Sequence, residues 1–155
     1  MNPETAMTPD TLLAAMGVKP VSFPRAIHPA VSSYYDLLSA FAVGVQENAG
    51  GLTTKLVYST LNSGYSITSY DKKGTTGLVL VWAFFDLTGE PIAEKAKVRV
   101  RFGAEKEYTT YTDPDSFAKA LLAFWERPET LFWLLVLQGH IDAPSSPYTV
   151  ALPLI

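Results

Sequence analysis

The pattern of apolar and polar positions predicts helices at both ends of the chain and strands between them. From Ala30 to about Asn48, apolar side chains recur every three or four residues, which is the period of an amphipathic helix. A shorter helix is predicted over residues 8–17. Thr8 suits the N-cap of that helix and Pro9 suits its first position.

Short apolar or alternating segments follow, and they predict a run of strands. Lys97–Phe102 alternates between basic and apolar residues, so one face of this strand should be buried and the other solvated. Leu78–Phe85 is apolar on both faces, which is typical of a central strand that is covered on each side. The predicted strands are Thr54–Leu61, Tyr65–Tyr70, Leu78–Phe85, Lys97–Phe102 and Glu107–Tyr111.

Two Phe-Trp pairs mark the helices that are predicted after the strands. The first helix should follow the N-cap Asp113 and run to about Glu126, and the second should extend from Pro128 to Gly139. The second helix is apolar on nearly all sides, and a helix of this kind must be buried on all sides. Because only one sheet is available, a neighbouring subunit is the expected cover for the remaining surface of that helix.

Together these elements predict an α+β fold. An antiparallel meander of four to five strands should carry the helices from before and after it mainly on one face. Residues 1–29 should form an extended N-terminal arm with a short helix, laid over the surface and not built into the core. Residues 30–141 should form a single core domain, and residues 142–155 a C-terminal tail that is broken by prolines.

The composition agrees with one folded domain that has little charge to solvate its surface. The chain has 155 residues, of which 48% are hydrophobic and 17% are charged, against a usual charged share of ~25%. A small domain of this kind must expose apolar surface or cover it with a partner. The apolar runs are too short to span a membrane and no signal peptide is apparent, so we expect a cytoplasmic or virion location.

Residue patterns that would indicate an enzyme or a metal site are missing from the sequence. The chain has no cysteine, and its two histidines, His28 and His140, lack the spacing of a zinc motif. No nucleophile elbow and no phosphate-binding glycine loop occur. Asp113 and Asp115 have the spacing of a helix N-terminus, not of a catalytic pair. We therefore expect no cofactor and no metal, and we favour a non-enzymatic protein over an enzyme.

Four basic residues form a stripe along one predicted strand. Lys95, Lys97, Arg99 and Arg101 recur with a period of two. They could form a track for phosphates or for an acidic partner, or a solvated strand face that also protects a sheet edge. A three-residue loop after this strand would place Arg101 opposite Glu107 and neutralise part of the stripe. The net charge of −3 favours the solvated face and argues against nucleic acid as a partner.

Three functions remain open, and the first is favoured. It is a non-enzymatic assembly or interaction protein, such as a virion or tail component, that docks onto further copies of itself or onto other protein subunits. The second is a small-ligand-binding protein or enzyme with a pocket between the sheet and the helices. The third is a nucleic-acid-associated protein. The candidate interaction residues are Phe124, Trp125, Phe132, Trp133, Leu152, Leu154 and Ile155.

Overall fold

The computed structural model describes residues 7–19, 32–59, 64–86 and 97–140. Helices precede and follow a block of strands in this part of the chain, which confirms the predicted α+β class and element order. The elements are α1 (Pro9–Ala15), α2 (Ser32–Asn48), β1 (Thr53–Ser59), β2 (Gly64–Tyr70), β3 (Gly77–Asp86), β4 (Lys97–Phe102), β5 (Thr109–Tyr111), α3 (Pro114–Trp125) and α4 (Pro128–Leu137).

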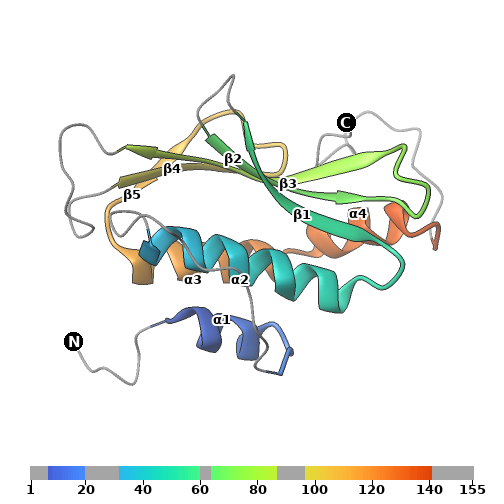
Figure 1. Ribbon diagram of the computed structural model, residues 1–155, viewed down its shortest axis with the longest axis horizontal. Coiled ribbons are helices and arrows are strands. Elements are labelled where there is room, and N and C mark those ends of the chain that lie inside the picture. Colours follow the sequence, from blue (N-terminus) through green and yellow to red (C-terminus); the bar gives the residue numbers. More distant parts are fainter. Residues whose placement is uncertain (1–6, 20–31, 60–63, 87–96, 141–155) are drawn as a thin grey trace.

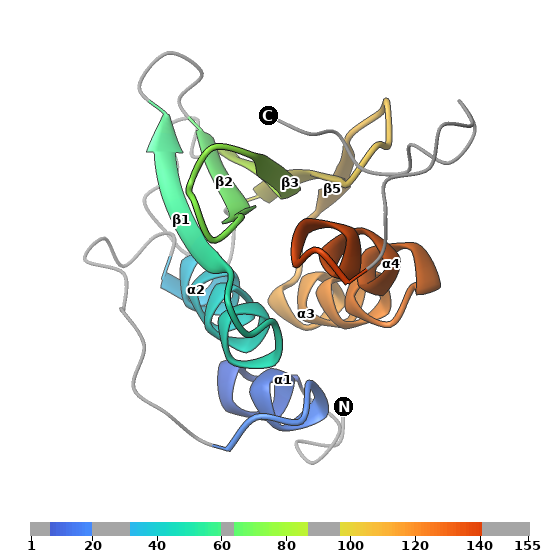
Figure 2. The ribbon, with the colours of Figure 1, turned by 90° about the vertical axis from the view of Figure 1, so that its right-hand side faces the viewer.

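The strands form one antiparallel meander, in which each strand pairs with the next (Figure 1). β3 lies in the centre, as predicted, and its pairing with β2 contains a register shift. The described helices lie on one side of the sheet, with α2 against β1, α4 against β3 and α3 against β5 (Figure 2). None of the described helices covers the opposite face, yet the consecutive residues Leu78, Val79, Leu80 and Val81 of β3 are all buried, as the sequence pattern indicates for a strand covered on both faces.

The hydrophobic core fills the space between the sheet and the helices. The ring of Phe124 in α3 stacks on Phe102 of β4 with 5.1 Å between centroids, and it lies 6.4 Å from the ring of Phe41 in α2. Ile67 of β2 and Val100 of β4 are fully buried in the same cluster. Packed side chains therefore occupy the centre of this space.

The short helix α1 forms a further layer beneath α2 (Figures 1 and 2). Leu12 and Met16 lie on one face of this helix, four residues apart, and both are buried in the main core cluster. Gly44 of α2 permits this close approach, because a Cβ atom there would lie 2.6 Å from the Met16 side chain. The helix is thus part of the core, and its interpretation as an arm laid over the surface is corrected. Residues 1–6 and 20–29 of the predicted arm lie outside the described residues, as does the predicted tail.

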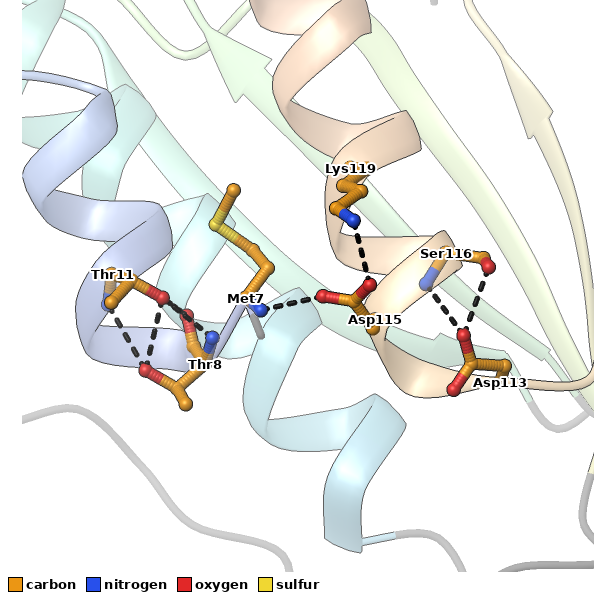
Figure 3. A network of polar contacts seen from close by, with 7 residues as sticks. All are labelled: Met7, Thr8, Thr11, Asp113, Asp115, Ser116 and Lys119. Carbon is orange, nitrogen blue, oxygen red and sulfur yellow. Dashed lines mark hydrogen bonds and ion pairs between the residues drawn. The ribbon is translucent and has the colours of Figure 1, made fainter. Parts of the chain in front are cut away.

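Two carboxylates at the start of α3 cap that helix and tie the chain before α1 to it (Figure 3). The carboxylate of Asp113 accepts a hydrogen bond from the backbone N–H of Ser116 at 3.1 Å, as an N-cap residue does. The carboxylate of Asp115 accepts the backbone N–H of Met7 at 2.5 Å and lies 2.8 Å from the Lys119 ammonium. Both carboxylates therefore have structural partners, as their spacing at a helix N-terminus indicates.

The Asp115 contacts predict a loss of stability in acid. The hydrogen bonds from Lys119 and from the Met7 N–H hold the pKa of Asp115 below its ordinary value of 3.8. Their contribution is complete above the ordinary pKa and is lost as the pH falls through the lowered, folded-state pKa. Asp115→Asn should therefore lower the urea midpoint at neutral pH, and the difference from the wild type should shrink in acid.

The matched control for this measurement is Asp10→Asn, which neutralises an exposed carboxylate in α1. This variant should follow the wild-type curve more closely than Asp115→Asn does. An Asp115→Asn midpoint equal to that of the wild type at neutral pH would show that the tie between Met7 and α3 contributes nothing to stability.

Helix α4 is covered on one side within this chain. Thr130, Trp133 and Leu134 are buried, whereas Leu131 is 58% exposed. The proposal that a neighbouring subunit covers the remaining surface of α4 stays a prediction. Among the described residues, no helix combines the length and the apolar character that crossing a membrane requires.

Candidate functional site

The basic residues of β4 point away from the helices. Val98, Val100 and Phe102 are buried in the core, so the alternating Lys97, Arg99 and Arg101 lie on the opposite face of the sheet. The predicted alternation of this strand is confirmed. Lys95, the first residue of the predicted stripe, lies outside the described residues.

The register between β4 and β5 changes the environment predicted for Arg101. Arg99 pairs with Thr110 and Val100 with Thr109, so Arg101 comes opposite Tyr108 and not opposite Glu107. The predicted neutralisation of the stripe by Glu107 is therefore wrong. The turn takes a different course because the Glu105 carboxylate folds back to accept the backbone N–H of Phe102 at 3.1 Å.

Two arginines and three aromatic residues gather on this face of the sheet, over the strands β3, β4 and β5. The Arg99 guanidinium lies 5.6 Å from the ring centroid of Phe84 and 5.7 Å from that of Tyr108. The Arg101 guanidinium lies 5.4 Å from the Tyr108 centroid, and Trp82 pairs with Arg101 in the sheet register. We call these five residues, Trp82, Phe84, Arg99, Arg101 and Tyr108, the arginine–aromatic cluster.

The rings of the cluster also contact one another and the next strand. Phe84 and Tyr108 meet edge to face with their centroids 5.4 Å apart, which is a favourable arrangement for two aromatic rings. The Phe84 ring lies over Gly64 of β2, where a Cβ atom would collide with it. Glycine at this position therefore makes room for the ring, and the cluster is packed onto three neighbouring strands and the start of β5.

The positive charges of the cluster have no carboxylate partner among the described residues. The ion pairs found there join Lys119 to Asp115 and Arg127 to Glu105 and Glu129, all on the helical side or at the β4–β5 turn. Arg99 is exposed and Tyr108 is 39% exposed. Both guanidinium groups therefore present a positive charge that no described residue of this chain neutralises.

One nitrogen atom of the cluster is buried without a partner. The Nε–H of Arg101 lies beneath neighbouring atoms and donates no hydrogen bond within the described part of the chain. An unpaired buried donor costs about 1–3 kcal/mol, so each such group in a folded protein needs an explanation. The neighbouring Tyr108 ring, 5.4 Å from the Arg101 guanidinium, offers that N–H no oxygen acceptor.

A second positively charged region lies at the other end of the sheet. An open depression of about 420 Å³ is lined by Lys55, Lys72 and Lys73 together with Thr53, Tyr70, Asp71 and Gly74. Burial acts to raise the pKa of Asp71, but hydrogen bonds from Thr76, Thr75 and Gly74 outweigh it and lower the pKa. Asp71 is thus held ionised as a turn-forming residue. The depression lies outside the space between the sheet and the helices, so it is not the pocket of the second hypothesis.

The predicted interaction residues divide between the core and its margin. Phe124 is fully buried and Trp133 is 2% exposed, so both are covered within this chain. Trp125 and Phe132 are half-buried. Leu152, Leu154 and Ile155 lie outside the described residues. The structure brings Phe124 and Trp125 around Phe41, and it places none of these four aromatic residues in the arginine–aromatic cluster.

The tyrosines are distributed over several places in the described part of the chain. Tyr34 and Tyr111 pack against Phe117 in the core. Tyr65 lies between Tyr35 and Tyr58 at the end of the β1–β2 pair. The described ranges contain no group of three or more His, Asp or Glu side chains that could hold a metal ion.

Sequence reasoning missed the aromatic half of the cluster. Trp82 and Phe84 are two residues apart in β3 and therefore share a face. The spacing can be read from the sequence. The whole strand is apolar, however, so the sequence does not distinguish this pair from the residues that are buried in the core. Their proximity to Arg99 and Arg101 follows from the strand register, which the sequence does not show.

Comparison of the chain with protein families, curated proteins and solved structures gives no match. The function is therefore argued from the residues of this chain.

Proposed function

We propose that this protein is a non-enzymatic interaction module, which assembles with neighbouring protein subunits by docking an acidic protein surface on the arginine–aromatic cluster. The observation that carries the proposal is the unneutralised positive charge of Arg99 and Arg101, held among aromatic rings on a sheet face that no described helix covers. Arginine and aromatic residues are the types that contribute most to binding energy at protein interfaces.

The chemistry of the cluster fits a partner that carries carboxylates. A guanidinium group offers several N–H donors in a planar fork and can bind a carboxylate through two parallel hydrogen bonds. The rings beside Arg99 and Arg101 limit the conformations of these long side chains, so less conformational entropy is lost on binding. The adjacent rings supply apolar area at the same place. An acidic surface with an aromatic or aliphatic side chain beside its carboxylates is the matching partner.

Single-stranded nucleic acid is the competing partner for such a surface. Aromatic rings can stack on bases while arginines contact phosphates. The net charge of −3 opposes this choice, because the field of the whole chain repels a polyanion whose length exceeds that of the cluster. An acidic protein surface can instead match the cluster in size. The test therefore compares the binding of an acidic polypeptide with the binding of a single-stranded nucleic acid.

The proposal is tested with a defined acidic probe. A labelled random copolymer of glutamate and tyrosine, short enough to match the cluster in size, should bind the wild-type protein, and the affinity should fall as salt is added. The double variant Arg99→Gln, Arg101→Gln should bind the copolymer about tenfold or more weakly, as expected when central charged residues of an interface are lost. Fluorescence anisotropy measures both affinities.

The matched control is the double variant Lys72→Gln, Lys73→Gln. It likewise removes two positive charges, but from the exposed β2–β3 turn. Comparing the two double variants therefore shows whether the copolymer affinity depends on charge at the cluster or only on the net charge of the protein. This control should keep most of the wild-type affinity. Equal losses in the two double variants, or an oligo(dT) of matched charge that binds more tightly than the copolymer, would overturn the proposal. The second of these results would favour nucleic acid as the partner.

A further inference from the structure

Strand β1 forms one edge of the sheet, and its hydrogen bonds show which backbone groups point outwards. The backbone N–H of Thr54 donates to the side-chain oxygen of Gln46 in α2 at 2.8 Å, so it points away from β2. The hydroxyl groups of Thr54 and Ser69 lie 2.8 Å apart, as expected for opposite residues that exchange no backbone hydrogen bonds. Both observations place Thr54 in the set of outward-directed residues.

The alternation of an antiparallel strand extends this assignment along β1. Residues two positions apart share the same orientation, so the N–H and C=O groups of Leu56 and Tyr58 also point outwards. Neither residue forms a hydrogen bond on that side with another described residue. The edge thus offers two residues, and four backbone groups, for pairing with another strand.

The side chains of this edge provide little of the usual protection against pairing. Exposed edge strands in natural proteins are commonly guarded by charges, prolines or bulges. β1 has the sequence TTKLVYS, with Lys55 as its one charged residue. Val57 is 42% exposed and Tyr58 is 50% exposed. An edge of this composition is suited to receive a further strand.

We propose that β1 pairs in antiparallel orientation with β1 of a second copy of this chain, about a two-fold axis at Val57. This register places Leu56 of each copy opposite Tyr58 of the other, and these outward-directed residues exchange four backbone hydrogen bonds. It leaves the bond between Thr54 and Gln46 intact. A register centred on Leu56 would require the Thr54 N–H and would break that bond.

The edge of β1 is complementary to itself in this register. Val57 meets Val57 of the other copy on the outer face, and the apolar Leu56 side chain meets the Tyr58 ring on the inner face. Lys55 comes opposite position 59 of the other copy, so no like charges face each other. A two-fold interface uses the same patch on both chains, and self-complementarity of this kind is its requirement.

This pairing goes beyond the proposed function because it uses the edge of the sheet and leaves the arginine–aromatic cluster free. The sheets of the two copies would join into one, and each copy would present its own cluster. Two clusters in one particle would bind a multivalent acidic partner more tightly than one cluster does, since the second contact forms at a high effective concentration.

Disulfide formation tests both the pairing and its register. The chain has no cysteine, so a single Val57→Cys substitution introduces one thiol per copy. Residues at the two-fold axis form a non-hydrogen-bonded pair with Cα atoms about 4.5 Å apart, a distance that a disulfide spans. Mild oxidation should convert most of the Val57→Cys protein into a covalent dimer on a non-reducing gel.

The matched control is Lys55→Cys, on the same face of the same strand. In the proposed register the two introduced thiols are four residues apart along the joined strands, about 13 Å, so this variant should not cross-link. Wild-type protein should have the mass of a dimer in light scattering, and circular dichroism should show that both variants keep the fold. A wild-type monomer at high concentration, or equal cross-linking of the two variants, would overturn the proposal.

Discussion

Replacing Phe124 by alanine should lower the free energy of unfolding by about 3–5 kcal/mol, which is the largest effect of any single substitution considered. The side chain is fully buried, and its ring stacks on Phe102 at 5.1 Å between centroids. The Arg127 guanidinium lies 5.3 Å from the same ring. Removing the ring would leave a cavity between α3 and the sheet that the surrounding side chains fill only in part. Urea denaturation followed by circular dichroism measures the change.

The matched control is Leu131→Ala in α4, which truncates an apolar side chain that is 58% exposed. Its effect on stability should stay within about 0.5 kcal/mol. Comparing these two variants also separates two possible roles of the Phe-Trp region, packing in the core of this chain and contact with another subunit. If Phe124→Ala left the urea midpoint unchanged and altered only self-association, the placement of Phe124 in the core of this chain would be contradicted.

The elements that depend on local signals could be predicted from the sequence. Thr8 and Asp113 cap their helices through side-chain oxygens, and a proline follows each of them at the first helical position. The hydroxyl or carboxylate and the proline act within one turn of chain, so their effect is independent of the rest of the fold. The alternation of β4 likewise identified its buried face.

The features that depend on distant residues could not be predicted in the same way. The role of α1 in the core rests on contact between Met16 and the space left by Gly44. The environment of Arg101 depends on the course of the β4–β5 turn, where Gly103 has a positive φ and its N–H donates to Leu80 of β3 at 2.8 Å. A shift of one residue in that turn places the aromatic Tyr108 opposite Arg101 in place of the acidic Glu107.

The arginine–aromatic cluster depends partly on a local sequence pattern and partly on contacts between distant residues. The sequence identified Arg99 and Arg101 as part of a basic stripe of four residues, and it favoured a solvated strand face for that stripe. Strand pairing adds Phe84 and Tyr108 as neighbours. Such rings change the expected behaviour of the arginines, because a guanidinium held among aromatic side chains is better ordered than one in open solvent. The charge of the cluster is therefore expected to select its partner.

Reversing that charge should reverse the choice of partner. The double variant Arg99→Glu, Arg101→Glu keeps long side chains on the exposed face of β4 but presents two carboxylates. Like charges brought together at an interface are strongly unfavourable, so the copolymer of glutamate and tyrosine should no longer bind at a measurable level. A copolymer of lysine and tyrosine should gain affinity for the same variant, since the aromatic rings remain in place.

The most direct measurement of the central claim is the affinity of the wild-type protein and of this variant for both copolymers, with folding of each protein verified by circular dichroism. A docking surface at the arginine–aromatic cluster predicts that the wild type binds the acidic copolymer and that the folded variant binds the basic one. A folded variant that keeps the wild-type preference for the acidic copolymer would place the binding surface elsewhere on the molecule and contradict the account.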